Sequence, residues 1–326
     1  MRYRLMGQTG LRVSELFLGA MKFGTPEGGS PPEECRRIVD LYDDAGGNVV
    51  DTANAYGDGR SETILGELLE RRRERFVLAT KYTISRDSTD PNAAGNHRKS
   101  LVHALEASLR RLRTDYVDVY WVHMWDRHTP LEETMRALDD VVRAGKVLYV
   151  GISDAPAWVV SRANTLAEWR GWAPFVGLQV PYNLLARDIE RELLPMAEAF
   201  GMTVAAWGPL AHGRLSGRLE GATGAPTDGH AVTLALREVA DEVGATPAQV
   251  AIAWTRAASR AVHPILGART AEQLKDGLGA LDVVLTHDAR ARLEAATDFT
   301  VGFPGDFIAK SSPWVFGEAS GRLDGR

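Results

Sequence analysis

The sequence predicts a (β/α)8 barrel. Short runs of β-branched and aromatic residues alternate with longer amphipathic segments over nearly the whole chain, which is typical of parallel strands joined by crossover helices. Eight such runs are present, and no glycine-rich G-x-G-x-x-G motif follows any of them, which disfavours an open dinucleotide-binding sheet. We therefore expect residues 1–326 to form a single barrel domain.

The expected strands follow the apolar runs in chain order. They cover residues 15–19, 48–52, 76–81, 116–123, 147–153, 175–180, 202–208 and 262–267. Ahead of the first run, the segments RYRLM and LRVSE flank Gln8, Thr9 and Gly10, a composition typical of a β-hairpin. We expect this hairpin to close one end of the barrel.

The expected helices lie between the strands and carry apolar residues at three- and four-residue spacing. Residues 31–47 begin with prolines and end with glycines, which commonly open and close helices. In residues 61–72, Ser61 is expected to cap the helix, and residues 96–112 and 130–146 repeat the helical pattern. Residues 215–230 are the most loop-like internal segment, long enough for a lid. The chain is expected to end in a C-terminal loop and tail.

Composition excludes several classes of protein. The 326 residues are 44% hydrophobic and 25% charged, close to the usual globular mix. A net charge of −5 argues against a surface for nucleic acid. The single cysteine, Cys35, cannot form an internal disulfide, and neither a signal-like apolar segment nor a membrane-length apolar run is present. We expect a cytoplasmic protein without membrane insertion. Homo-oligomerisation remains open.

Polar residues gather at the ends of three consecutive expected strands, where the active sites of such barrels lie. Asp51 closes the second strand, Tyr56 follows it, and Lys81 and His123 close the third and fourth. Each alone has a structural explanation: a turn cap, a rim aromatic, a solvated strand end or a hydrogen-bonded histidine. Their joint placement favours a catalytic site instead.

These four side chains suit the reduction of a carbonyl group. A phenol with a pKa near 10 is a poor proton donor unless its anion is stabilised, and Lys81 is predicted to lower the pKa of Tyr56. Asp51 would hold that lysine charged. His123 would donate to the substrate oxygen as negative charge develops there.

Several segments resemble the aldo-keto reductase superfamily, and the resemblance covers almost the entire chain. They are DTANAYGDGRSE, the lysine ending FVLATK, and DYVDVYWVH. Further segments resemble bacterial members related to potassium-channel β subunits and to microbial sugar or aldehyde reductases: SLRRLRTDYVDVY, PLEETMRALDDVVRAGKVLYVGIS and VGFPGDF. The resemblance implies a barrel fold and a catalytic tetrad of Asp51, Tyr56, Lys81 and His123.

The resemblance also implies a nicotinamide cofactor, NADPH/NADP+. Its carboxamide would be held by Ser153, Asp154 and Gln179, and its ring would stack on Trp207. Three positions depart from the family pattern: Asp154 replaces a usual asparagine, Trp207 a frequent tyrosine, and Gly277 a frequent asparagine near adenine. An ionised Asp154 cannot donate to the carboxamide oxygen.

Other expected cofactor contacts are spread over the strand ends. Arg269 begins a predicted helix, where it and backbone N–H groups would clamp a 2′-phosphate, which favours NADPH over NADH. The remaining expected contacts are, for the nicotinamide ribose, Gly19, Ala20 and Met21; for the pyrophosphate, Gly208, Pro209, Leu210, Gly213, Ser216 and Arg218; and for the adenine, Gln273. Asp51 and Gly267 are also expected to contact the cofactor.

The substrate pocket is expected to be apolar and aromatic. Its candidate walls are the C-terminal residues 301–316 and the side chains of Phe23, Tyr56, Tyr82, His123, Met124 and Trp125. Such walls suit aryl or alkyl aldehydes and ketones. A nucleotide-sugar ketone would also need anion contacts, for which the candidates are Arg86, His97, Arg98 and Arg127 unless they form a solvated loop.

The leading hypothesis is NADPH-dependent carbonyl reduction with hydride from the nicotinamide and a proton from Tyr56. The alternative is a nicotinamide-binding, redox-sensing auxiliary subunit in which catalysis is slow or incidental. A metal-dependent barrel hydrolase is disfavoured, because the eight histidines do not fall in a ligand pattern, and no metal is expected. The direction of the reaction remains open.

Overall fold

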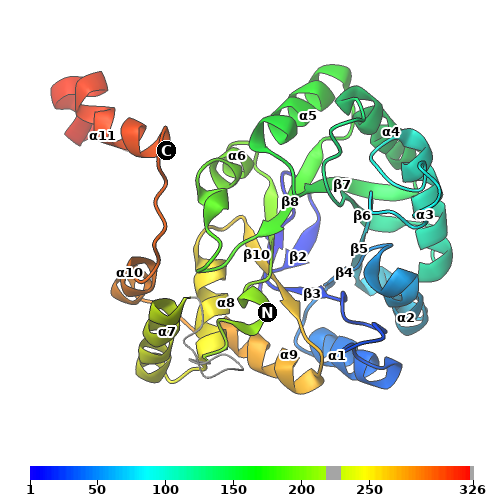
Figure 1. Cartoon of the computed structure of the whole chain (residues 1–326), viewed down its shortest axis with the longest axis horizontal. Helices are drawn as coiled ribbons and strands as arrows, with labels where there is room; N and C mark the ends of the chain where they lie inside the picture. The colour runs from blue at the N-terminus through cyan, green and yellow to red at the C-terminus, as the bar shows by residue number, and fades with distance from the viewer. Residues whose placement is uncertain (218–228, 324–326) are drawn as a thin grey trace.

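The computed structural model describes residues 1–217 and 229–323 and contains a closed barrel of eight parallel strands, as predicted (Figure 1). Around the barrel the strands run in the order β10, β3, β4, β5, β6, β7, β8 and β9. Their bounds are β3 Phe17–Gly19, β4 Val49–Asp51, β5 Val77–Tyr82, β6 Val117–Val122, β7 Val147–Ser153, β8 Phe175–Pro181, β9 Thr203–Trp207 and β10 Val262–Gly267.

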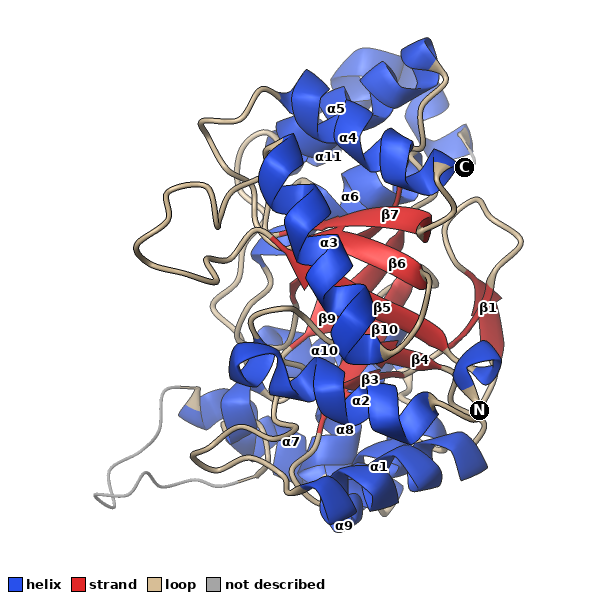
Figure 2. Cartoon of the chain, turned by 90° about the vertical axis from the view of Figure 1, so that its right-hand side faces the viewer, coloured by secondary structure: helices blue, strands red, loops and turns tan. Residues whose placement is uncertain are grey.

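Helices α1 to α8 connect successive strands around the barrel, and α9 to α11 follow the last strand (Figures 1 and 2). Their bounds are α1 Pro32–Asp44, α2 Arg60–Leu69, α3 Arg98–Leu112, α4 Leu131–Arg143, α5 Ala157–Arg170, α6 Leu193–Ala199, α7 His230–Val243, α8 Pro247–Ala257, α9 Ala271–Leu278, α10 His287–Ala295 and α11 Gly305–Phe316. Within the described residues, none of these helices has the length and apolar content needed to cross a membrane.

The prediction that Ser61 caps a helix is wrong. The helix α2 begins one residue earlier, after Gly59, whose φ of 85° is in the left-handed region that glycine adopts freely. The Ser61 hydroxyl is buried, donates to the backbone oxygen of Ala20 at 2.8 Å and contacts the Thr52 hydroxyl at 2.8 Å. It therefore ties α2 to the ends of β3 and β4 rather than satisfying a helix terminus.

An antiparallel hairpin lies before the barrel, formed by β1 (Tyr3–Leu5) and β2 (Arg12–Ser14). Met6 and Val13 from the hairpin are buried in the same cluster as the side chains inside the barrel. The hairpin lies beside one end of the barrel in Figure 2, as the sequence predicts. This arrangement closes the end opposite to the functional residues described below.

The interior of the barrel is packed with side chains. Trp121 occupies the middle, and a Cβ atom added at Gly151 would lie 2.3 Å from its ring and one at Gly177 2.8 Å. These two glycines therefore make the space that the indole fills. Successive side chains of a strand alternate between the interior and the surrounding helices. Because of this alternation, the residue at or just after the carboxyl end of each strand points into the barrel. These residues are Gly19, Asp51, Lys81, His123, Ser153, Gln179, Trp207 and Gly267.

The C-terminal segment differs from the loop and tail that the sequence predicts. After α10 the chain forms the helix α11 and a 3-10 helix η6 (Gly317–Arg322). Figure 1 shows α11 standing apart from the barrel. Of the loop-like segment 215–230, residues 218–228 lie outside the described part of the chain, so the predicted lid is left as a prediction.

Candidate functional site

Asp51, Tyr56, Lys81 and His123 meet at the carboxyl end of the barrel. Asp51 ends β4, Lys81 lies on β5, His123 follows β6, and Tyr56 begins the 3-10 helix η1 (Tyr56–Gly59). The Lys81 ammonium donates to the Asp51 carboxylate and to the Tyr56 hydroxyl, the latter at 3.1 Å. The rings of Tyr56 and His123 stand edge to face with centroids 5.8 Å apart. The structure thus brings together all four residues that the sequence singles out.

Lys81 is fully buried but keeps its charge. Burial lowers its pKa, yet Asp51 and Tyr56 act in the opposite direction, and together they raise the pKa above its ordinary value. The ammonium also donates to the backbone oxygen of Thr52 at 2.8 Å, so all three of its protons have acceptors. A buried cation is therefore fixed beside the phenol.

The net pKa of Tyr56 differs from the prediction. Burial raises the pKa of the phenol above 10, while Lys81 opposes this shift and Asp51 adds to it. Lys81 therefore acts in the expected direction, but desolvation of the tyrosinate outweighs it. The phenol stays protonated at neutral pH, which is the form that a proton donor needs.

His123 is neutral at physiological pH. Burial, together with the positive charge of Lys81, lowers its pKa to about 3. Its Nδ1 atom is buried and has no hydrogen-bond partner among the described residues. A neutral imidazole carries one N–H donor and one acceptor, so it can hold a carbonyl oxygen beside Tyr56.

The neighbouring strand ends offer polar groups for a nicotinamide carboxamide. The Gln179 side chain on β8 donates to the Asp51 Oδ1 atom at 3.0 Å, which links it to the tetrad. The Ser153 hydroxyl at the end of β7 is buried and makes no direct hydrogen bond within the described part of the chain, although it lies near enough to Asp154 to lower the pKa of that carboxyl. An unpaired buried hydroxyl costs free energy unless a ligand satisfies it. These two groups therefore fit a bound amide.

Asp154 and Trp207 lie next to these groups and contact each other. The Trp207 indole N–H donates to the Asp154 Oδ1 atom at 3.4 Å. Burial raises the pKa of the Asp154 carboxyl, and the indole opposes that shift. The hydrogen bond helps to fix the orientation of the indole ring, which the resemblance noted in the sequence predicts to stack on a nicotinamide.

Glycines leave open space after β9. Gly208 and Gly213 have φ values of 65° and 94°, and a Cβ atom added at either would have no atom within 4 Å. A backbone without side chains can approach a phosphate closely. Pro209, Leu210 and Ser216 lie in the same segment, whereas Arg218 lies outside the described residues.

The adenosine end would face the start of α9. Gly267 ends β10, Arg269 follows it, and Thr270 caps the helix by accepting from the Gln273 backbone N–H. The Gln273 side chain in turn accepts from the Arg269 N–H at 2.9 Å. This contact places Gln273 against the backbone of the expected phosphate-binding arginine.

Around the end of β3, Gly19 and Ala20 lie at the strand end and Met21 is exposed. Gly277 lies buried on α9, where an added Cβ atom would make ordinary contacts with Leu266 and Ile252. A larger side chain there would have to displace these core residues.

Two predicted pocket residues, Phe23 and Tyr82, do not face the site. Both are fully buried in the cluster between the barrel and its helices. Tyr82 follows Lys81 on β5, and because side chains alternate along a strand, it points away from the interior, where it stacks on Tyr120 at 5.1 Å. Met124 is exposed and Trp125 is half-buried, so both remain candidates for the pocket.

Of the four candidate anion contacts, two have structural partners and two are exposed, as the alternative of a solvated loop implies. His97 caps α3 by accepting from the Ser100 N–H, and Arg98 pairs with Asp140 at 2.5 Å, so both have structural partners. Arg86 and Arg127 are exposed. The C-terminal residues 301–316 do not form a wall, since the helix within them stands apart from the barrel in Figure 1.

The sequence analysis missed Trp158, in the first turn of α5. Its ring packs edge to face on Trp125, with centroids 5.6 Å apart. A tryptophan in an amphipathic segment resembles an ordinary core residue, so composition gave no signal. Its place four residues after Asp154 was the available clue.

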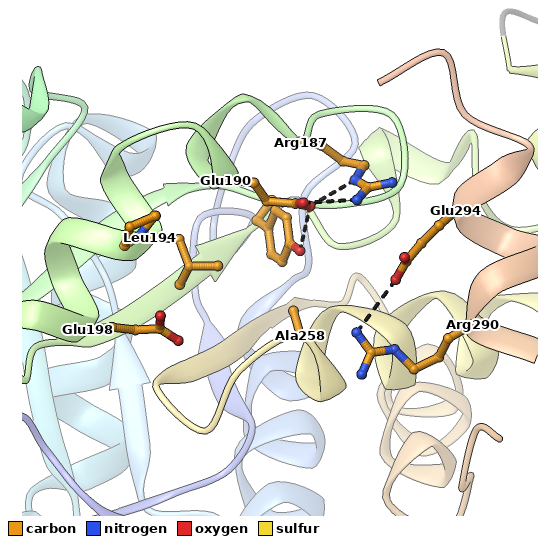
Figure 3. A pocket seen from close by; sticks show the side chains of 9 residues that line it. Arg187, Glu190, Leu194, Glu198, Ala258, Arg290 and Glu294 are labelled. Atoms are coloured by element: carbon orange, nitrogen blue, oxygen red, sulfur yellow. Dashed lines mark hydrogen bonds and ion pairs between the residues drawn. The ribbon is translucent and has the colours of Figure 1, made fainter. Parts of the chain in front are cut away.

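A cavity of about 270 Å³ lies away from the tetrad, between α6, α8 and α10 (Figure 3). Four of its charged side chains form two ion pairs, and the fifth, Glu198, accepts from the Ser259 hydroxyl. Arg187 binds Glu190, which also accepts from Tyr182, and Arg290 pairs with Glu294. No residue of the tetrad lines this cavity, so it is separate from the candidate site. Within the described residues, no cluster of His, Cys, Asp or Glu is placed to hold a metal ion.

Comparisons with known proteins find one matching family and several similar chains. A family model described as the aldo/keto reductase family matches residues 15–298. The chain is 41% identical to a norsolorinic acid reductase of Emericella nidulans, over 93% of this chain and 83% of that protein. It is 37% identical to a putative aryl-alcohol dehydrogenase of Saccharomyces cerevisiae, over 94% and 89%. It is 38% identical to an aryl-alcohol dehydrogenase [NADP(+)] of Phanerodontia chrysosporium, over 97% and 91%.

Proposed function

Since this chain belongs to the aldo/keto reductase family, we propose that it uses NADPH to reduce an aromatic aldehyde or ketone, with Tyr56 as the proton donor. The observation that carries the proposal is the contact of Tyr56 with the buried ammonium of Lys81. The names of two relatives support an aryl substrate, because both are called aryl-alcohol dehydrogenases.

Tyr56 and His123 would act on the carbonyl oxygen. Their rings lie edge to face, so an oxygen between them can accept from the Tyr56 hydroxyl and from an imidazole N–H. When bound, NADPH supplies the hydride to the carbonyl carbon. The phenol then transfers its proton to the oxygen, and the product is an alcohol.

Lys81 and Asp51 would support that proton transfer. As the proton leaves, the ammonium 3.1 Å from the phenol oxygen stabilises the developing tyrosinate. Asp51 keeps the ammonium charged in a site where burial alone would lower its pKa. Two donors fix this carboxylate, Lys81 on one oxygen and Gln179 on the other.

The cofactor would be held by polar side chains and by open backbone at the carboxyl end of the barrel. Ser153 and Gln179 would bind the carboxamide, and the open backbone at Gly208 and Gly213 would approach the pyrophosphate. Arg269 would bind the 2′-phosphate, and the name of one relative, which includes NADP(+), supports this preference.

The test is to follow NADPH consumption by the purified protein over matched aromatic and aliphatic aldehydes and ketones, with identification of each alcohol product. NADPH deuterated at the pro-R position should transfer its deuterium, as the family implies. Tight binding of NADPH without turnover of any carbonyl would contradict the proposal and would favour the redox-sensing auxiliary subunit.

A further inference from the structure

Two tryptophans meet at the rim of the barrel. Trp125 lies in the loop after β6 and Trp158 in the first turn of α5, and their rings are nearly perpendicular, at 83°. The Trp125 backbone N–H approaches the Asp154 backbone oxygen at 3.5 Å, so the loops after β6 and β7 lie side by side. The pair therefore joins two loops at the end of the barrel that carries the tetrad.

Each tryptophan of the pair follows a residue of the proposed active site by a few positions in the sequence. Trp125 is two residues from His123, which stands beside Tyr56. Trp158 is four residues from Asp154, which accepts from the Trp207 indole. Both tryptophans therefore lie on segments that leave the end of the barrel that carries the tetrad.

Trp158 is exposed although it has an aromatic partner. Its relative exposure is 58%, so most of its apolar surface is not used by the fold. Trp169, near the other end of α5, is 87% exposed and has no ring contact within the described part of the chain. Trp158 therefore has an aromatic neighbour that can orient its ring, whereas Trp169 has no such neighbour among the described residues.

We propose that Trp158 and Trp125 together bind the planar aromatic part of the carbonyl substrate, and that Trp158 is a specificity-determining residue. Perpendicular indoles offer one ring face and one ring edge, and flat aromatic groups pack favourably on both. A saturated ring of similar size lacks these quadrupole contacts. The inference rests on the proposed function of the Tyr56 site, which it deepens by naming the side chains that select the substrate.

Steady-state kinetics test the inference with 2-naphthaldehyde, benzaldehyde and cyclohexanecarbaldehyde. Trp158→Ala should raise KM for 2-naphthaldehyde about tenfold, the equivalent of one aromatic stacking contact. The kcat/KM for cyclohexanecarbaldehyde should stay close to the wild-type value, and Trp158→Phe should restore most of the aromatic preference. Trp169→Ala is the matched control on the same helix and should match the wild type.

A binding measurement separates this inference from the proposed function. Calorimetric titration of 2-naphthylmethanol into the protein with NADPH bound measures the aromatic contact without turnover. We expect weaker binding in Trp158→Ala and unchanged binding in Trp169→Ala. Equal losses for aromatic and saturated aldehydes, or unaltered 2-naphthylmethanol binding in Trp158→Ala, would overturn the inference. Failure of the wild type to reduce any carbonyl would instead contradict the proposed function.

Discussion

The Lys81 ammonium lies 3.1 Å from the Tyr56 hydroxyl and is itself fully buried. Burial disfavours the charged form of both groups, the lysine cation and the tyrosine anion. Asp51 keeps Lys81 charged, and the lysine cation in turn lowers the free-energy cost of forming the Tyr56 anion. The tetrad is therefore best regarded as one electrostatic unit.

The first prediction concerns Asp51→Asn. Without the carboxylate, burial should lower the pKa of Lys81, so that the alkaline limb of the kcat/KM profile moves down by about one pH unit or more. The profile is measured by NADPH consumption between neutral and alkaline pH. Asp118→Asn, which breaks a buried pair with Arg73, is the control and should leave the limb in place. An unmoved limb in Asp51→Asn would show that Asp51 does not hold the lysine charged.

The second prediction concerns cofactor choice. Arg269→Ala should weaken NADPH binding by about 10- to 100-fold, the usual range for losing charge-assisted hydrogen bonds to a phosphate. Binding of NADH should hardly change, because NADH lacks the 2′-phosphate. Fluorescence titration with both cofactors measures the two affinities. An equal loss of affinity for NADPH and NADH would mean that Arg269 supports the fold of the site and does not bind the 2′-phosphate.

The third prediction concerns acid stability. His263 is buried, donates through Nδ1 to the Ser14 backbone oxygen, and has a pKa lowered to about 4 by burial. Between that value and about 6.5 the unfolded chain binds a proton that the folded chain does not. Stability should therefore fall as the pH drops through this window, by roughly 3 kcal/mol from this residue at most.

Urea unfolding of the wild type and His263→Gln at pH 7 and 4.5 checks this prediction. The difference between the two pH values should shrink in His263→Gln, which cannot gain a proton in this window. His103→Gln, at an exposed position on α3, is the control. A pH dependence that is unaltered by His263→Gln would contradict the assignment.

The fourth prediction concerns the barrel interior. Gly151→Ala should destabilise the protein by about 1–3 kcal/mol, because the new methyl group would meet the Trp121 ring. Gly10→Ala is the matched control, since a Cβ atom there has no neighbour within 4 Å. The two free energies of unfolding are compared by urea titration. Equal stability of the two variants would mean that the interior is not packed as described.

Much of the fold could be predicted because strand and helix periodicities differ and each strand here is a short apolar run. The tetrad could be predicted because the carboxyl ends of parallel strands converge, which brings Asp51, Lys81 and His123 together whatever their distance in sequence. Alternation along β5 would also have excluded Tyr82 from the pocket, since Lys81 beside it points inward.

Other features depend on contacts that periodicity does not encode. The cap of α2 depends on the left-handed φ of Gly59, and the role of Ser61 depends on contacts with β3 and β4. The pKa of Tyr56 depends on how deeply the fold buries it, which no motif states. The pairing of Trp158 with Trp125 requires knowing that the loops after β6 and β7 are neighbours. The apolar residues of the C-terminal segment show no periodicity from which its position relative to the barrel could be predicted.

The most direct test of the central claim is the single-turnover rate of Tyr56→Phe with bound NADPH and an aromatic aldehyde that the wild type reduces. The variant lacks only the hydroxyl that Lys81 contacts, so cofactor affinity should stay near the wild-type value. The account predicts a rate of reduction lower by about 100-fold or more, in line with the loss of a positioned proton donor. Reduction at the wild-type rate by Tyr56→Phe would contradict it.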